Sequence, residues 1–136
     1  MITKSIIDDL SYRIIGAAIE VHKTLGPGLL ENIYKQCLFQ ELTILGIDVL
    51  KEQSVPLFYK GLEMDTNLRF DLLVEGLIVV ELKTVDKLLP IFDAQLLTYM
   101  KLVKAPKGVL INFNVANLFY QGQKTLVNSY YDKLPR

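Results

Sequence analysis

The sequence has little of what would assign it at once to a secreted or membrane protein. Its single cysteine, Cys37, cannot form a disulfide within the chain, and we expect a buried thiol rather than a nucleophile. Its apolar runs, such as LIVV at 77–80, last only a few residues, whereas a membrane-spanning helix needs about 20. The chain also does not open with the charged and apolar regions of a signal peptide. We therefore expect a soluble cytoplasmic protein that does not contact membranes.

A net charge is also lacking, since 15 basic residues balance 15 acidic ones. This balance argues against a protein that coats nucleic acid by electrostatics alone. No repeat and no low-complexity linker divides the 136 residues, a length close to that of one domain. With 51% hydrophobic and 22% charged residues, the composition is that of a folded globular chain. The sequence therefore predicts a single domain over residues 1–136.

Three helices are predicted from apolar periodicity and from residues that begin or end helices. Apolar side chains recur at three- and four-residue steps over 6–25, which is typical of an amphipathic helix, and the GPG at 26–28 ends it. A second helix is predicted over 29–45, with Gly46 as its C-terminal stop. Pro90 suits the first position of a third helix, predicted over 90–103.

Segments rich in Val, Ile, Leu and Phe predict the strands. VPLFYKG at 55–61 and LRFDLLVEGLIVVELKTV at 68–85 predict three antiparallel strands, and GVLINFN at 108–114 predicts a further buried strand. The tail over 118–131 is ambiguous, with one short strand at 124–127 and room for a closing helical turn. Together these elements predict an α+β or α/β domain in which helices flank a mixed central β-sheet.

Three ionisable residues interrupt the apolar strands. Asp71 lies in one run, and Glu81 and Lys83 lie in the next. Because Glu81 and Lys83 are two residues apart, their side chains project from the same face of a strand. A three-residue loop at 75–77 would set Asp71 directly opposite Glu81, whereas a two-residue loop would put the carboxylates on opposite faces. We expect the three-residue loop, or a bulge with the same effect.

Two adjacent carboxylates repel each other and are costly to bury. Either one of them takes up a proton, or a cation lies between them. With a lysine alongside, a hard divalent cation is the simpler solution, since Mg²⁺ prefers carboxylate and carbonyl oxygens together with water. We therefore expect Mg²⁺ or Mn²⁺ as the cofactor. The alternative is a purely structural network of buried ions, which would have no affinity for metal.

This pattern resembles the signature of the PD-(D/E)XK nuclease superfamily, which Asp71, Glu81 and Lys83 match. Phe70 stands where the signature has a proline, but that position varies widely in the superfamily. The resemblance implies a restriction-endonuclease-like core. It also implies metal-dependent hydrolysis of phosphodiester bonds in nucleic acid, with DNA favoured as the substrate.

Two further motifs narrow the resemblance. Gln95 and Tyr99, in QLLTY, lie on one face of a helix and resemble the Q-x-x-x-Y element of RecB-like nucleases. In GPGLLENIY, Gly28, Glu31 and Tyr34 reproduce the pattern of the small bacterial proteins called the GxxExxY family, a group placed in the same superfamily. The matching stretches follow one another in the family's order over residues 10–128.

The resemblance implies roles for the acidic residues and the lysine. Asp71, Glu81 and the backbone carbonyl of Leu82 would hold the metal ion. Glu31 would complete the site, directly or through a water molecule. Lys83 would orient the attacking water or stabilise the charge that builds on the phosphorus centre.

Four other residues receive supporting roles. Gln95 would fix the water or Lys83 by hydrogen bonds, and Tyr99 would assist it. Tyr34 is interpreted as a core aromatic with a solvated hydroxyl. His22 could be a metal ligand on an early helix, although a histidine that stabilises the helix C-terminus is the preferred interpretation.

Other interpretations remain open. Glu31 could serve only the helix dipole, because a carboxylate in the first turn interacts favourably with the free N–H groups there. A catalytically inactive relative could keep the same residues as a nucleic-acid-binding or protein-interaction module, and the zero net charge somewhat favours it. We expect nucleic acid as the partner and leave a homodimer open.

Overall fold

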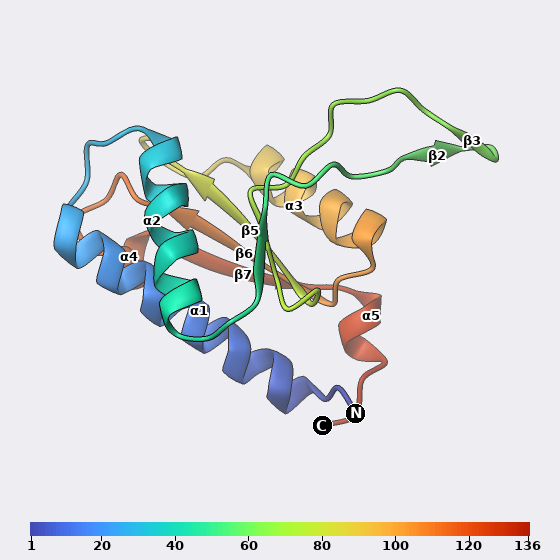
Figure 1. The fold of residues 1–136 in the computed structure, drawn as a ribbon, viewed down its shortest axis with the longest axis horizontal. Coiled ribbons are helices and arrows are strands. Elements are labelled where there is room, and N and C mark those ends of the chain that lie inside the picture. Colours follow the sequence, from blue (N-terminus) through green and yellow to red (C-terminus); the bar gives the residue numbers. More distant parts are fainter.

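The centre of the computed structural model, which describes residues 1–136, is a five-stranded mixed sheet (Figure 1). Its strands lie in the order β1-β4-β5-β6-β7, in which β5 and β6 are parallel and the other neighbouring pairs are antiparallel. The predicted mixed sheet flanked by helices is confirmed. The strands are β1 (Val49–Lys51), β4 (Leu72–Val74), β5 (Ile78–Lys83), β6 (Lys107–Asn112) and β7 (Gln123–Val127).

Helices cover both faces of this sheet. The long helices α1 (Lys4–Leu25) and α2 (Glu31–Ile44) lie on one face, and α3 (Pro90–Val103) lies on the other (Figure 1). All three helices were predicted, and their ends differ from the predicted ranges by at most two residues. None of them is both long and apolar enough to cross a membrane.

Two hydrophobic cores result from this layering. Val80 on β5 belongs to the larger core beneath α1 and α2, whereas its neighbour Val79 belongs to the smaller core beneath α3, as the alternation of a strand requires. Cys37 on α2 packs against the larger core but is only half-buried, so the predicted buried thiol is less buried than expected. The sheet is thus buried on both faces.

The approach of α3 to the sheet depends on Gly108 in β6. A Cβ atom there would lie 2.6 Å from the sulfur of Met100 and 2.8 Å from Cγ of Leu96, both on α3. Glycine therefore allows the helix to pack directly on the strand. Because α3 connects the parallel strands β5 and β6, the C-terminal ends of both strands lie at the same edge of the sheet.

The prediction of a sheet strand over 55–61 was wrong. Within it, β2 (Phe58–Tyr59) pairs only with β3 (Leu62–Glu63), and this two-stranded hairpin projects from the body of the molecule (Figure 1). The place beside β4 is taken by β1, which was not predicted. Pro56 explains part of the difference, because it has no N–H group to donate to a sheet ladder. Phe58 and Tyr59 are 62% and 61% exposed, so no core draws the hairpin inward.

The tail forms more structure than was predicted. The strand over 124–127 is part of β7, and the closing helical turn is α5 (Ser129–Asp132). A short helix, α4 (Leu118–Gln121), lies between β6 and β7 and was not predicted.

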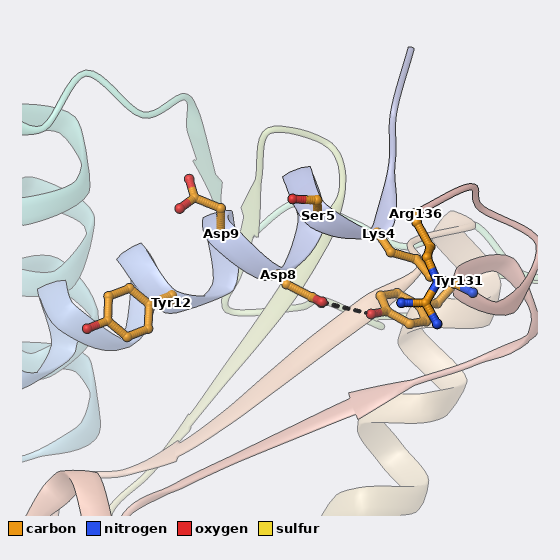
Figure 2. A pocket seen from close by; sticks show the side chains of 7 residues that line it. All are labelled: Lys4, Ser5, Asp8, Asp9, Tyr12, Tyr131 and Arg136. Carbon is orange, nitrogen blue, oxygen red and sulfur yellow. Dashed lines mark hydrogen bonds between the residues drawn. The ribbon is translucent and has the colours of Figure 1, made fainter.

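The two ends of the chain meet beside the start of α1. The Lys4 N–H group donates to the carbonyl of Pro135 at 2.7 Å, and the Tyr131 hydroxyl donates to the Asp8 carboxylate (Figure 2). Asp8 also accepts a hydrogen bond from the buried Lys107 ammonium at 3.0 Å. A hollow of about 630 Å³ opens here, lined by charged side chains that include Lys4 and Arg136. Asp8, at its centre, already has partners in Lys107 and Tyr131, which join the two ends of the chain.

Candidate functional site

The turn between β4 and β5 brings two carboxylates together. Residues 75–77 form a three-residue loop that pairs Val74 with Ile78, and the register places Asp71 beside Glu81. The Asp71 N–H group donates to Oε1 of Glu81 at 3.1 Å, and the Leu82 N–H group donates to Oδ2 of Asp71 at 2.8 Å. The predicted register is therefore confirmed, and Asp71 continues the β4–β5 pairing through its side chain.

Glu75 holds this loop in its conformation. Its backbone has a positive φ of 55°, which a residue other than glycine adopts only when its surroundings compensate. Here the Glu75 N–H group donates to the Asp48 carbonyl at 2.8 Å, and the Asp48 N–H group donates to Oε1 of Glu75 at 2.9 Å. This reciprocal pair ties the loop to the start of β1 and thereby fixes the register on which the site depends.

The carboxylate pair is strained electrostatically. Withdrawal from water, with a further contribution from the negative charge of Asp71, raises the pKa of Glu81 from its ordinary value of 4.5 to about 9. Lys83 opposes this rise but does not cancel it. In the protein alone, a proton on Glu81 therefore relieves the repulsion at neutral pH.

A second lysine, which was not predicted, completes the surroundings of Asp71. The Lys35 ammonium on α2 lies 3.1 Å from Oδ1 of Asp71 and 3.2 Å from Oε1 of Glu52. The side chains of Lys35 and Asp71 are only 13% and 14% exposed, so this ion pair is largely withdrawn from water. Lys35 follows Glu31 by one helical turn, and this spacing was the only signal in the sequence that could have found it.

Glu31 begins α2 and lies within electrostatic reach of this cluster. Burial raises its pKa, the charge of Asp71 raises it further, and Lys83 and Lys35 oppose both effects. Glu31 makes no hydrogen bond to Asp71 or Glu81. Its position at the first residue of α2 also suits the helix dipole, so the two interpretations of this residue are compatible.

Gly28 and Tyr34 shape the loop that delivers Glu31. Gly28 has a φ of 103°, a conformation that side-chain-bearing residues rarely adopt. The buried Tyr34 ring stacks on Phe113 at 4.4 Å, and its hydroxyl donates to the Gly26 carbonyl at 2.5 Å. The same hydroxyl accepts from the Leu29 N–H group at 3.2 Å, so the expectation of a solvated hydroxyl was wrong. The motif residues thus fix the entry of the chain into α2.

Lys83 and Tyr99 approach the carboxylates from the side of α3. The Lys83 ammonium lies 4.5 Å from the centre of the Phe92 ring, which keeps the lysine on this side of the sheet. Burial raises the pKa of Tyr99, and the negative charges of Glu81 and Asp71 raise it further. Both residues therefore belong to the same cluster as the acidic pair.

Gln95 and His22 are not brought into contact with the carboxylates. Gln95 is exposed and makes no hydrogen bond; with Tyr99 and Leu68 it lines a shallow hollow of about 300 Å³ along α3. His22 is buried in the last turn of α1, where Nε2 lies 2.8 Å from the carbonyl of Val115. His22 thus lies at the helix C-terminus as the preferred interpretation places it, but its ring contacts the Val115 carbonyl and no carbonyl of the helix end.

The donor set at this site suits a hard cation. Asp71 and Glu81 offer carboxylate oxygens on neighbouring strands, and magnesium in proteins is usually held by one or two carboxylates together with water and substrate phosphate. No group of three or more His, Cys, Asp or Glu side chains is arranged to hold a metal ion. The two carboxylates are thus of the kind that suits a hard divalent cation, and they do not form a complete protein cage.

A mixed sheet that carries a carboxylate pair and a lysine on adjacent strands is the arrangement that the signature of Asp71, Glu81 and Lys83 predicts. The family model of the PD-(D/E)XK nuclease superfamily matches residues 8–125, most of the chain. The chain therefore belongs to the PD-(D/E)XK nuclease superfamily. It matches no curated protein and no solved structure.

Proposed function

We propose that this protein hydrolyses phosphodiester bonds of nucleic acid, with DNA favoured as the substrate. The observation that carries the proposal is the pairing of Asp71 with Glu81, with Lys83 two residues further along the same strand. Membership of the nuclease superfamily supports the same reaction class.

Mg²⁺ or Mn²⁺ is the proposed cofactor. Asp71, Glu81 and the backbone carbonyl of Leu82 would hold it, and Glu31 would complete the site through a water molecule. When bound, such an ion polarises the phosphate and lowers the pKa of the attacking water. Burial raises the pKa of Glu31, and the charge of Asp71 raises it further; this second effect supports its inclusion.

The remaining side chains act on the water and the phosphate. Lys83 would orient the water or stabilise the charge on the phosphorus centre, a task suited to a compact ammonium. Tyr99 would support Lys83 from α3. Gln95 would have to turn inward from its exposed position to join them when substrate binds.

Three finer assignments belong to the same proposal. Residues 1–136 would act as one domain, since both hydrophobic cores share a single sheet. The protein would act in the cytoplasm. It would also be a GxxExxY protein, and the loop that Gly28 and Tyr34 shape before Glu31 supports this family assignment.

The second candidate function is binding of nucleic acid or protein without turnover. The ion pair between Lys35 and Asp71 favours it, because this pair already satisfies one of the proposed metal ligands. The zero net charge also favours it, since the chain has no overall attraction for a polyanion.

A substrate panel separates these functions. Labelled single-stranded and double-stranded DNA and RNA are incubated with Mn²⁺ and the wild type, the Asp71→Asn variant, or the Asp48→Asn control, whose side chain is exposed and outside the site. We expect cleavage by the wild type and by Asp48→Asn, and loss of cleavage in Asp71→Asn. Binding without cleavage would favour the second function, and cleavage that survives in Asp71→Asn would contradict the proposed site.

A further inference from the structure

Both oxygens of the Asp71 carboxylate already have partners within the chain. Oδ2 accepts the Leu82 N–H group at 2.8 Å, and Oδ1 faces the Lys35 ammonium at 3.1 Å. The first contact belongs to the sheet, because it replaces a backbone pairing at the end of β4. The second comes from α2 on the other side of the cluster. Lys35 therefore occupies the oxygen of Asp71 that the sheet leaves available.

A cation on this oxygen competes with a metal ion. An ammonium at hydrogen-bond distance takes one of the two lone pairs of that oxygen, and its charge repels any divalent ion beside it. The competition is strengthened by burial, because the pair is largely withdrawn from water and therefore poorly screened. Lys83, in contrast, lies over the Phe92 ring and makes no ion pair with either carboxylate.

Glu52 gives Lys35 a second place to bind. Its carboxylate lies 3.2 Å from the same ammonium and is 48% exposed, so it can hold the lysine without Asp71. The Glu52 N–H group donates to the Asp71 carbonyl at 3.0 Å, which keeps the two acids side by side. The ammonium bridges the two carboxylates, and the flexible stem of a lysine allows it to release Asp71 while it stays on Glu52.

We propose that Lys35 closes the metal site: its ammonium holds Asp71 in the metal-free protein and must release it, remaining on Glu52, before a divalent ion can bind. Lys35 is in this sense a positioning residue that lowers the affinity for metal below that of the carboxylate pair alone. The inference rests on the proposed function, because it assumes that Asp71 is a metal ligand.

The test is a calorimetric titration of the full chain with Mn²⁺. Lys35→Met removes the charge and keeps most of the stem, and we expect the dissociation constant for Mn²⁺ to fall by about tenfold or more. Lys51→Met is the matched control: this lysine, on the strand next to β4, lies over the Phe39 ring and makes no ion pair with a carboxylate. Its removal should leave the dissociation constant within about threefold of the wild type. If circular dichroism shows that Lys35→Met is not folded, Lys35→Gln takes its place.

Variants of Glu52 provide a second, independent test of the proposal. Glu52→Gln should weaken Mn²⁺ binding in the wild type, because Lys35 loses its second partner, and should have no effect in the Lys35→Met background. Such non-additivity would identify an interaction between the two side chains. An equal effect in both backgrounds would mean that Glu52 acts on the metal directly, and would overturn the proposed movement of Lys35.

The outcomes separate this inference from the proposed function. If the wild type binds Mn²⁺, Asp71→Asn abolishes binding, and Lys35→Met binds no more tightly, the closing role is overturned and the metal site stands. If no variant binds Mn²⁺, including Lys35→Met, both are overturned. Binding that appears or tightens only when Lys35 is removed, and that Asp71→Asn abolishes, supports both.

Discussion

Glu81 lies between Asp71 and Lys83, and its protonation sets the charge of the whole cluster. Its pKa of about 9 arises first from withdrawal from water and then from the charge of Asp71. An acid whose folded pKa exceeds its unfolded value makes the folded protein bind the extra proton between those two values. The contribution of Glu81 to stability is therefore greatest below its unfolded pKa and is lost as the pH rises toward the folded one.

The first prediction follows from this decrease of stability with rising pH. Without metal, in the presence of a chelator, the free energy of unfolding of the wild type should fall between pH 5 and pH 9, with a slope of at most about 1.4 kcal/mol per pH unit from this residue. Glu81→Gln, which cannot ionise, should flatten the curve, and Glu63→Gln on the exposed hairpin should not. Urea unfolding at three pH values measures this. Parallel curves for the wild type and Glu81→Gln would show that the carboxyl group is not buried as described.

The Glu31 carboxylate has two compatible roles, stabilising the helix dipole and completing the site, and each predicts a different consequence of losing its charge. A residue that serves only the helix dipole contributes at most about 1 kcal/mol of stability. A residue that completes the site also affects the metal and the reaction.

The second prediction is that Glu31→Gln weakens Mn²⁺ binding and slows cleavage by at least about tenfold, equivalent to 1.4 kcal/mol in the barrier. The change keeps the shape and hydrogen-bonding capacity of the side chain and removes only the charge. Titration and cleavage rates measure it, with Asp48→Asn as the control for general electrostatics. Unchanged metal binding and unchanged cleavage would return Glu31 to the role of stabilising the helix dipole.

Contacts between residues of one local pattern could be predicted from the sequence, whereas contacts between residues that meet only in the folded protein could not. Asp71 and Glu81 could be paired from the length of one turn, because side chains alternate strictly along strands. Lys35 could not be paired with Asp71 in this way, since the two residues lie on different elements and lysines are common on helix surfaces. The exposed position of Gln95 could not be predicted from the sequence either, because the face of α3 that packs on the sheet is known only from the structure.

Among the elements, the GPG loop before α2 has the most specific construction. The Tyr34 hydroxyl bridges the Gly26 carbonyl and the Leu29 N–H group, and the ring stacks on Phe113. The loop and the first turn of α2 are thus held by one buried side chain from the following turn. The position of Glu31 depends on that contact.

The third prediction is that Tyr34→Phe lowers the free energy of unfolding by about 1–3 kcal/mol, because two backbone groups lose their partner while the stacking is kept. Tyr120→Phe is the control, since that side chain is 82% exposed. Urea unfolding compares the two variants with the wild type. A loss in Tyr34→Phe no larger than in Tyr120→Phe would mean that the hydroxyl does not hold the loop.

The elements differ in how far the sequence determines them. Helix α1 was predicted from its apolar stripe, and it begins slightly earlier because the Thr3 side chain accepts the Ile6 N–H group at 3.1 Å. The segment 55–61 has strand-forming composition, yet it became a hairpin outside the sheet. Composition reports which residues favour extended structure, but the pairing partner of a strand is decided by tertiary packing.

At the scale of the whole molecule, two polar clusters lie at opposite ends of the parallel strands β5 and β6. Lys107 begins β6, opposite Ile78 at the start of β5, and its contact with Asp8 lies beside the chain ends. Lys83 ends β5, opposite Asn112, where Glu31 arrives from α2 and Tyr99 from α3. In the first cluster, Asp8 is held by Lys107 and by Tyr131, whose hydrogen bond Figure 2 shows. In the second, a proton on Glu81 and the Lys35 ammonium on Asp71 relieve the repulsion of the carboxylates in the metal-free protein.

The central claim is that this second cluster performs phosphodiester hydrolysis, and the rate of DNA cleavage by Lys83→Ala tests it most directly. With Mn²⁺ and enzyme in excess, we predict that the wild type and Lys87→Ala, an exposed lysine on the following loop, cleave at similar rates. Lys83→Ala should be slower by about 100-fold or more, the usual cost of removing one group that stabilises transition-state charge. Equal cleavage by Lys83→Ala and the wild type, or no cleavage by the wild type at all, would contradict the account.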